Sequence, residues 1–219
     1  WKSLKMLSLG NSEGTGGKDV SGEIIMVRSM EEYDKLSPEQ VKDKIVFFNY
    51  PFSQTYIETF RGYGDAAKYR STAASLTAKK GGKFAIIRSL SSAFDDVPHT
   101  GSMRYQDDKK IPAVAVGSTT ADELAELLKS QKITAKLNSN CGMKGEKLSH
   151  SVIGEITGKK DKSVIVVGGH LDSWDVGEGA HDDGSGIVQS IEVLRTFKNL
   201  GIQNNHTIRV VCFANEENG

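Results

Sequence analysis

Residues 163–175 read SVIVVGGHLDSWD, an apolar run that ends in two glycines followed by His170 and Asp172. Such a run predicts a strand covered on both faces, as in an open α/β sheet. A second run of this kind, HTIRVVCFAN at 206–215, leads into two glutamates. Because open α/β sheets bind ligands beyond the carboxyl ends of their strands, we expect both polar groups to serve one site.

The residues between these two runs predict a Gly-rich loop followed by a helix over about 184–200. Gly201 follows the last turn, where glycine commonly ends a helix. An earlier strand is expected at 151–157, joined to the first apolar run by the turn GKKDK. The expected helix carries its apolar face on Ile187, Val188, Ile191 and Leu194.

Residues 1–138 predict a separate α/β domain, because strand-like and helix-like segments alternate along them. A polar, Gly-rich stretch at 11–19 predicts a loop. The polar segment 138–149 predicts an irregular connection, so we place two domains at 1–138 and 139–219. Strands are expected at 44–49, 84–87, 111–116 and 132–137, and helices at 64–80 and 120–129, the second opened by the capping box TADE at 120–123.

The composition argues against several classes of partner. Lysine and arginine together number 28, as do aspartate and glutamate, so no general attraction to nucleic acid is expected. No window of the sequence approaches the roughly 20 apolar residues that span a bilayer. Cys141 and Cys212 form no C-x-x-C motif, so neither a disulfide framework nor a thiolate zinc cluster is expected.

His170 and Asp172 lie two residues apart at a strand end, so their side chains are expected on the same side. The carboxylate can then orient a metal-bound imidazole. A histidine that is merely hydrogen-bonded in a loop explains H-x-D equally well. The pair therefore needs further ligands before it indicates a metal site.

Two more acidic pairs supply candidate ligands. Asp182 and Asp183 are adjacent in GAHDDGSG, where two carboxylates repel each other unless a cation or hydrogen-bond donors offset them. Asp182 is the candidate ligand, and Asp183 is expected to cap the following helix. Glu216 and Glu217 end the next strand, and strand alternation would point one toward a metal and the other toward water. A solvated turn is the alternative for this last pair.

One imidazole and several carboxylates form a donor set suited to zinc. The sequence contains no H-E-x-x-H, which disfavours a helix-borne single-zinc protease. The segment HDDGSGI at 181–187 does not fit the G-x-S-x-G of a serine nucleophile, and the sequence contains no G-x-G-x-x-G of a dinucleotide site.

The order and spacing of H-x-D, G-A-x-D-D-G-S-G and a strand-terminal E-E resemble the co-catalytic zinc aminopeptidase family. A narrower resemblance, to zinc dipeptidases of that family, covers most of the chain. It is carried by residues 158–186, PHTG at 98–101, Tyr105 and KIPAVAV at 110–116. The resemblance implies an α/β fold in which a protease-associated cap domain, residues 1–138, precedes the first part of a zinc-exopeptidase sheet domain.

The resemblance also implies a role for each candidate residue in hydrolysis with two zinc ions. His170 would ligate one zinc ion, Asp182 would bridge both, and Glu217 would ligate the other. Glu216 would be the general base, and Asp172 would support His170 from behind. A cis peptide bond between Asp182 and Asp183 is implied as well.

The family pattern needs one further aspartate and one further histidine as ligands, both expected after Glu217. The chain therefore resembles a fragment of the enzyme, and the fragment itself is expected to be inactive. Among local residues, His181 is expected to point away from the site, and Trp174 is expected to pack or to form a wall of the cleft. His99 is a candidate contact of the cap domain with substrate.

Two other functions stay open at this point: an aminopeptidase that acts on longer peptides, and a non-catalytic protease-associated binding module. The resemblance suggests an exported protein, either periplasmic, secreted or lysosomal, and a homodimer that hydrolyses small peptides. Asn205-His206-Thr207 matches the N-glycosylation motif, although a motif this short is frequent by chance.

Overall fold

The computed structural model describes residues 1–106, 109–174 and 176–217. The chain forms two compact units, Trp1–Lys144 and Gly145–Gly219. The boundary expected after residue 138 falls in the irregular segment that follows the last strand of the first unit. No helix among the described residues is long and apolar enough to cross a membrane.

The first unit is built on a six-stranded sheet with the order β1-β5-β4-β3-β2-β6. Its central strands pair in parallel, and the edge strands β1 and β6 pair antiparallel. Every residue of β3 and β5 is buried, as expected for parallel strands covered on both faces. The strands are β1 (Met6–Ser8), β2 (Val20–Val27), β3 (Ile45–Phe48), β4 (Phe84–Arg88), β5 (Ala113–Val116) and β6 (Thr134–Leu137).

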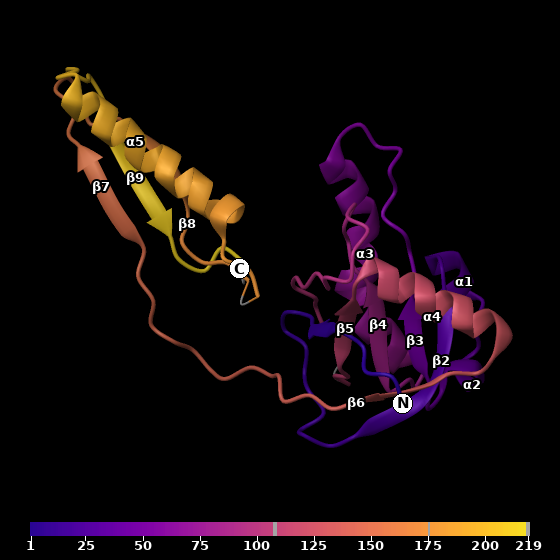
Figure 1. Cartoon of the computed structure of the whole chain (residues 1–219). Coiled ribbons are helices and arrows are strands. Elements are labelled where there is room, and N and C mark those ends of the chain that lie inside the picture. The colour runs from indigo at the N-terminus through magenta and orange to yellow at the C-terminus, as the bar shows by residue number, and fades with distance from the viewer. Residues whose placement is uncertain (107–108, 175, 218–219) are drawn as a thin grey trace. The chain divides into compact units, whose positions relative to one another are not determined.

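Two helices make the sheet of the first unit the middle layer of three. The 21-residue α3 (Thr59–Lys79) packs with Val46 and Phe48 on one face. On the other face, α4 (Ser118–Ser130) packs with Ile45 and Phe47, and Figure 1 shows this helix crossing the strands. This alternation along β3 follows the two-residue period of a strand. Two short helices, α1 (Met30–Asp34) and α2 (Pro38–Val41), connect β2 to β3.

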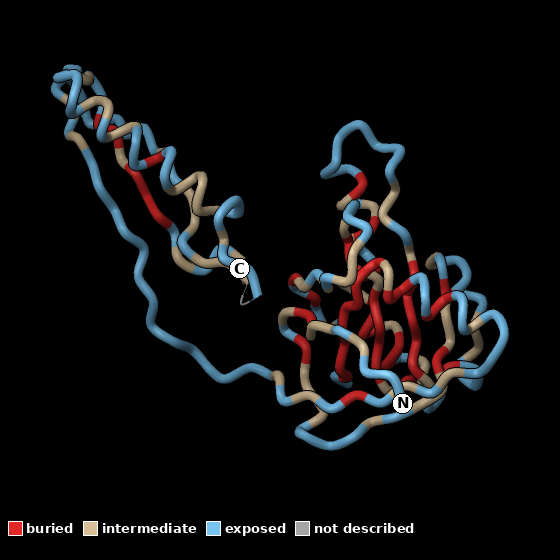
Figure 2. The backbone as a smooth tube through the Cα atoms, in the orientation of Figure 1, coloured by how far each residue is buried: buried red, intermediate tan, exposed pale blue. Residues whose placement is uncertain are grey.

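The second unit contains a three-stranded sheet with the order β7-β9-β8. The central strand β9 (Thr207–Phe213) pairs antiparallel with β7 (Val152–Ile156) and parallel with β8 (Val164–His170). Helix α5 (Ser185–Asn199) packs against β8 and β9 and follows a kinked turn, η1 (Ala180–Gly184). Figure 2 shows burial concentrated in β9, whereas most of β7 and β8 is exposed.

The expected elements are present with small shifts in their ends, but three expectations are wrong. Helix α4 begins two residues before Thr120, so the expected capping box lies inside the helix and the Thr120 hydroxyl binds Asp96 instead. In α5, Ile187 and Leu194 of the expected apolar face are half-buried and Ser190 is buried, whereas Val188 and Ile191 are 67 % and 50 % exposed. Strand β8 is not covered on both faces by the described residues, and its Val166 is 55 % exposed.

The layered core of the first unit predicts a strong position dependence of stability. Phe47 is fully buried, whereas Phe94 is 76 % exposed. We expect Phe47→Ala to lower the free energy of unfolding of this unit by about 3–5 kcal/mol, because it leaves a cavity between sheet and helix. The control Phe94→Ala is expected to change it by less than about 0.5 kcal/mol. Urea unfolding followed by circular dichroism tests this, and equal losses in the two variants would contradict the layered packing.

Candidate metal centre

The candidate site lies where two parallel neighbours, β8 and β9, leave the sheet of the second unit. Their register pairs His170, the last residue of β8, with Phe213, the last residue of β9. The Leu171 N–H donates to the Phe213 carbonyl over 2.7 Å, so the segments that follow β8 and β9 stay together just beyond the strands. The residues that follow each strand are thereby held at one edge, as the sequence predicted.

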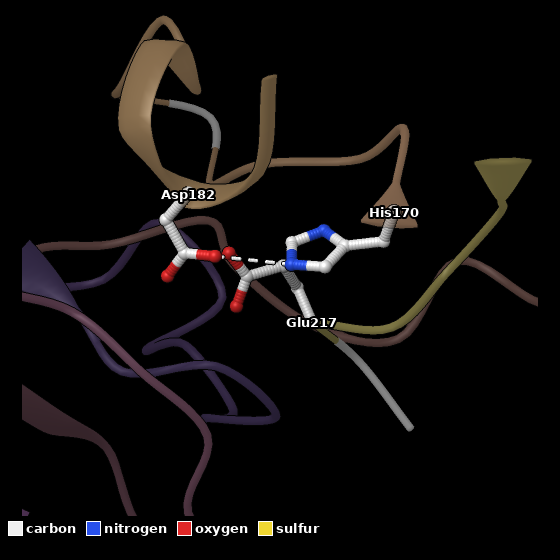
Figure 3. A group of neighbouring side chains, drawn as sticks. All are labelled: His170, Asp182 and Glu217. Carbon is white, nitrogen blue, oxygen red and sulfur yellow. Dashed lines mark hydrogen bonds and ion pairs between the residues drawn. The ribbon is translucent and has the colours of Figure 1, made fainter. Parts of the chain in front are cut away.

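Three side chains from different segments meet at this edge: His170, Asp182 and Glu217 (Figure 3). One potential ligand atom from each lies within 4.8 Å of the others, and His170 Nε2 is 3.0 Å from Asp182 Oδ1. Two ligands of one tetrahedral zinc ion, each about 2.0–2.1 Å from it, are roughly 3.3 Å apart. The donor chemistry and spacing of this cluster therefore fit a zinc ion after small inward movements.

The orientation of the His170 ring determines which nitrogen can bind a metal. Nδ1 lies 2.8 Å from the main-chain carbonyl of Asp172. A carbonyl oxygen only accepts, so Nδ1 carries a proton, and Nε2, on the Asp182 side of the ring, is the nitrogen that a neutral ring can offer to a metal. The expectation that the Asp172 carboxylate orients the ring is wrong, since that carboxylate is 3.7 Å from Nδ1.

The Asp172 carboxylate instead holds the chain that follows β9. It accepts the main-chain N–H groups of Glu216 over 2.9 Å and Glu217 over 3.0 Å. The regular strand has already ended, and Asn215 turns the chain with a φ of 67°. Strand alternation is therefore not what separates the two glutamates. Glu216 is exposed with its carboxylate 3.7 Å from His170 Nε2, and Glu217 is half-buried in the cluster.

Asp183 joins the end of β8 to the start of α5. Its carboxylate accepts the N–H of Gly186 over 3.1 Å, which confirms the expected helix cap. It also accepts the His170 N–H over 3.1 Å, a contact that the sequence analysis missed. An added Cβ would lie 2.4 Å from this carboxylate at Gly169 and 2.2 Å at Gly186, so a side chain at either position would displace the carboxylate from these bonds. The peptide bond between Asp182 and Asp183 is cis, as the resemblance implied.

The surroundings of the cluster shift the pKa values of His170, Asp172 and Glu217. Burial lowers the pKa of His170, but its bond to the Asp172 carbonyl and the Asp182 and Glu216 carboxylates outweigh burial and raise it. Burial raises the pKa of Asp172, and the N–H groups of Glu216 and Glu217 outweigh burial and lower it. Burial and the Asp182 carboxylate raise the pKa of Glu217. A bound cation would offset this accumulated negative charge.

Three other residues singled out in the sequence lie outside this cluster. His181 is exposed, and its carbonyl accepts the Ser185 hydroxyl over 2.8 Å. Trp174 is half-buried near the end of β8. His99 belongs to the first unit, where it is exposed and its N–H donates to the Ser89 hydroxyl over 2.8 Å. A role for His99 in substrate binding stays a prediction.

Part of the resemblance rests on residues that hold the first unit together. The Tyr105 hydroxyl donates to the Ile111 carbonyl over 2.7 Å and accepts the Glu13 N–H over 2.8 Å. The Thr100 hydroxyl in PHTG donates to the Ser8 carbonyl over 2.8 Å. These side chains tie the β1 edge to the segment before β5.

Comparison with known proteins agrees with this site. Residues 151–219 match the model of peptidase family M28. Carboxypeptidase Q of Xenopus laevis is 38 % identical over 221 residues, which cover 100 % of this chain and 45 % of that protein. Human carboxypeptidase Q is 35 % identical over 219 residues, covering 99 % of this chain and 44 % of that protein. The chain thus spans less than half the length of these relatives.

Solved structures give the same result. A peptidase M28 precursor from Shewanella amazonensis matches with a TM-score of 0.90 and 33 % identity, over 99 % of this chain and 49 % of that one. An aminopeptidase from Aneurinibacillus matches with a TM-score of 0.63 and 23 % identity, over 100 % of this chain and 48 % of that one, which shows a shared fold. The chain is therefore similar to carboxypeptidase Q along its whole length, and its residues 151–219 match peptidase family M28.

Proposed function

We propose that the parent protein of this chain is a zinc-dependent exopeptidase that hydrolyses small peptides. The observation that carries the proposal is the cluster of His170, Asp182 and Glu217 at the carboxyl ends of two paired strands. Homology to carboxypeptidase Q over the whole chain supports the same activity. Residues 1–138 are proposed to be a protease-associated cap domain.

The cluster is proposed to hold two zinc ions together with ligands from elsewhere in the parent protein. His170 would bind one ion through Nε2, Asp182 would bridge both, and Glu217 would bind the other. Zinc, when bound, polarises a scissile carbonyl and makes water a stronger nucleophile near neutral pH. The hydrogen bond from Nδ1 to the Asp172 carbonyl supports this role, because it leaves Nε2 free for the metal.

Glu216 is proposed to accept the proton of the attacking water. Its carboxylate is exposed and lies beside the ligand cluster without belonging to it. Asp172 would position both glutamates through their main-chain N–H groups and leave their carboxylates free. The exposed Glu216 is thus available to take a proton from water, whereas the half-buried Glu217 is placed to bind metal.

The substrate is proposed to be a small unblocked peptide, with His99 of the cap domain as a contact, and the enzyme is proposed to be an exported homodimer. Activity of the full-length protein on dipeptides, compared with longer peptides that share the same amino-terminal residue, tests the length preference. Faster hydrolysis of the longer peptides would favour the aminopeptidase alternative.

The two glutamates are expected to fail differently when substituted in the full-length protein. Glu216→Gln should keep both zinc ions and lower kcat about 10²- to 10⁴-fold, because it removes a general base. Glu217→Gln should lose zinc as well, because an amide is a weaker ligand than a carboxylate. Metal content and turnover of both variants test this. Equal zinc loss in the two would overturn the assignment.

The 219-residue chain is expected to retain at most one loosely bound zinc ion and to show no peptidase activity. A catalytic zinc ion normally has three protein ligands, whereas the residues that the structure describes bring three side chains in all to the cluster. Incubation with excess zinc, gel filtration and metal analysis measure retention, and unblocked dipeptides measure turnover. Two retained ions with turnover that Glu216→Gln abolishes would contradict the expectation.

Asp183 is expected to position His170 without binding metal. Asp183→Ala removes the acceptor for the His170 and Gly186 N–H groups, so both amides should exchange faster and the 219-residue chain should bind zinc more weakly. The lost helix cap should cost about 1 kcal/mol. Asp161→Ala is the control, because it removes a similar bond to the Ser163 N–H before β8 begins, together with a 2.9 Å contact to His206 Nδ1. Equal effects of the two variants on zinc binding would refute a positioning role.

A further inference from the structure

We propose that Asn205 of the parent protein carries an N-linked glycan. Asn205-His206-Thr207 is the single N-x-S/T motif in the 219 residues. Asn205 lies in the loop that connects α5 to β9, and Thr207 is the first residue of β9. The inference rests on export of the protein and is independent of the proposed peptidase activity.

The loop leaves the Asn205 side chain available while fixing the chain around it. The Asn205 carbonyl accepts the Lys160 N–H over 3.1 Å, and the Asn204 carbonyl accepts the Lys159 N–H over 3.2 Å. The Asn204 side chain donates to the carbonyls of Ile156 and His206 over 3.2 and 2.7 Å. Within the described part of the chain, no hydrogen bond engages the Asn205 side chain, and the residue is exposed.

Thr207 shows when the modification must occur. In the folded unit it is 8 % exposed and its hydroxyl accepts the Gly158 N–H over 3.0 Å. Its own N–H donates to the Ser163 carbonyl over 3.0 Å. A glycosyltransferase that needs this hydroxyl can reach it only before β9 joins its neighbours. The glycan is therefore added to the unfolded chain during export.

The proposed step is a group transfer from a lipid-pyrophosphate-linked oligosaccharide. The Asn205 side-chain nitrogen forms a bond to the first sugar carbon and loses one proton. The bond between that carbon and the pyrophosphate oxygen breaks, and the lipid pyrophosphate leaves with the electron pair. No oxidant or reductant is needed.

The position of Asn205 keeps the glycan away from the candidate metal centre. Asn205 precedes β9, whereas Glu216 and Glu217 follow it. The seven residues of β9 separate the two ends by roughly 20 Å at about 3.3 Å per residue. Removal of the glycan by Asn205→Gln is therefore expected to leave turnover of the full-length protein unchanged.

The test is expression of the full-length gene in a eukaryotic secretory cell, followed by digestion with trypsin. The tryptic peptide 199–209 contains the motif together with two other asparagines, Asn199 and Asn204, which serve as internal controls. Peptide N-glycosidase converts a glycosylated asparagine to aspartate, so mass spectrometry should find aspartate at position 205 alone. Untreated protein should yield little of the unmodified peptide.

Four variants make the assignment specific. Asn205→Gln and Thr207→Ala should abolish the modification, whereas Thr207→Ser and Asn204→Gln should retain it. Thr207→Ala removes the acceptor of the Gly158 N–H. If that variant fails to fold, loss of the glycan in Asn205→Gln and its retention in Thr207→Ser still test whether Asn205 is modified. Recovery of the protein with unmodified Asn205, from the medium or from the cytosol, would overturn the proposal.

Discussion

The parallel pairing of β8 with β9 is the constraint on which the candidate metal centre depends. Seven register pairs run from Val164 opposite Thr207 to His170 opposite Phe213. The segments after β8 and β9 therefore leave the sheet at the same edge, and the Asp172 carboxylate can reach main-chain N–H donors that follow β9. A slip of one residue would turn His170 to the other face of the sheet. The apolar runs that set this register thus also aim the imidazole.

Two aspartates that are not proposed as ligands organise the residues that are. Asp172 holds the chain of Glu216 and Glu217, and Asp183 holds the main chain of His170 against α5. Each uses its carboxylate on main-chain N–H groups, which are numerous where strands end and helices begin. The remaining carboxylates stay close together, and their mutual repulsion creates a site that a cation stabilises.

In the second unit, the candidate metal ligands and the proposed glycosylation site lie at opposite ends of β9. Candidate metal ligands lie at or beyond the carboxyl ends of β8 and β9, and Asn205, the proposed glycosylation site, lies before the amino end of β9. The turn with Lys159 and Lys160 fixes the loop that carries the motif. A bulky modification and an open catalytic edge are thus compatible in one small sheet.

The amino-acid sequence by itself determined the alternation of strands and helices, because buried parallel strands such as β3 and β5 require continuous apolar runs. It also determined which acidic and imidazole groups follow the strands, and the helix cap at Asp183. Only the tertiary structure decided that His170 is oriented by a main-chain carbonyl, since every residue carries one and no side-chain pattern marks it. Only the tertiary structure decided that Ser190, rather than Ile191, is the buried residue of α5, because burial depends on where the helix meets the sheet. Contacts between segments distant in the chain depend on register and packing, and these are set by the whole unit at once.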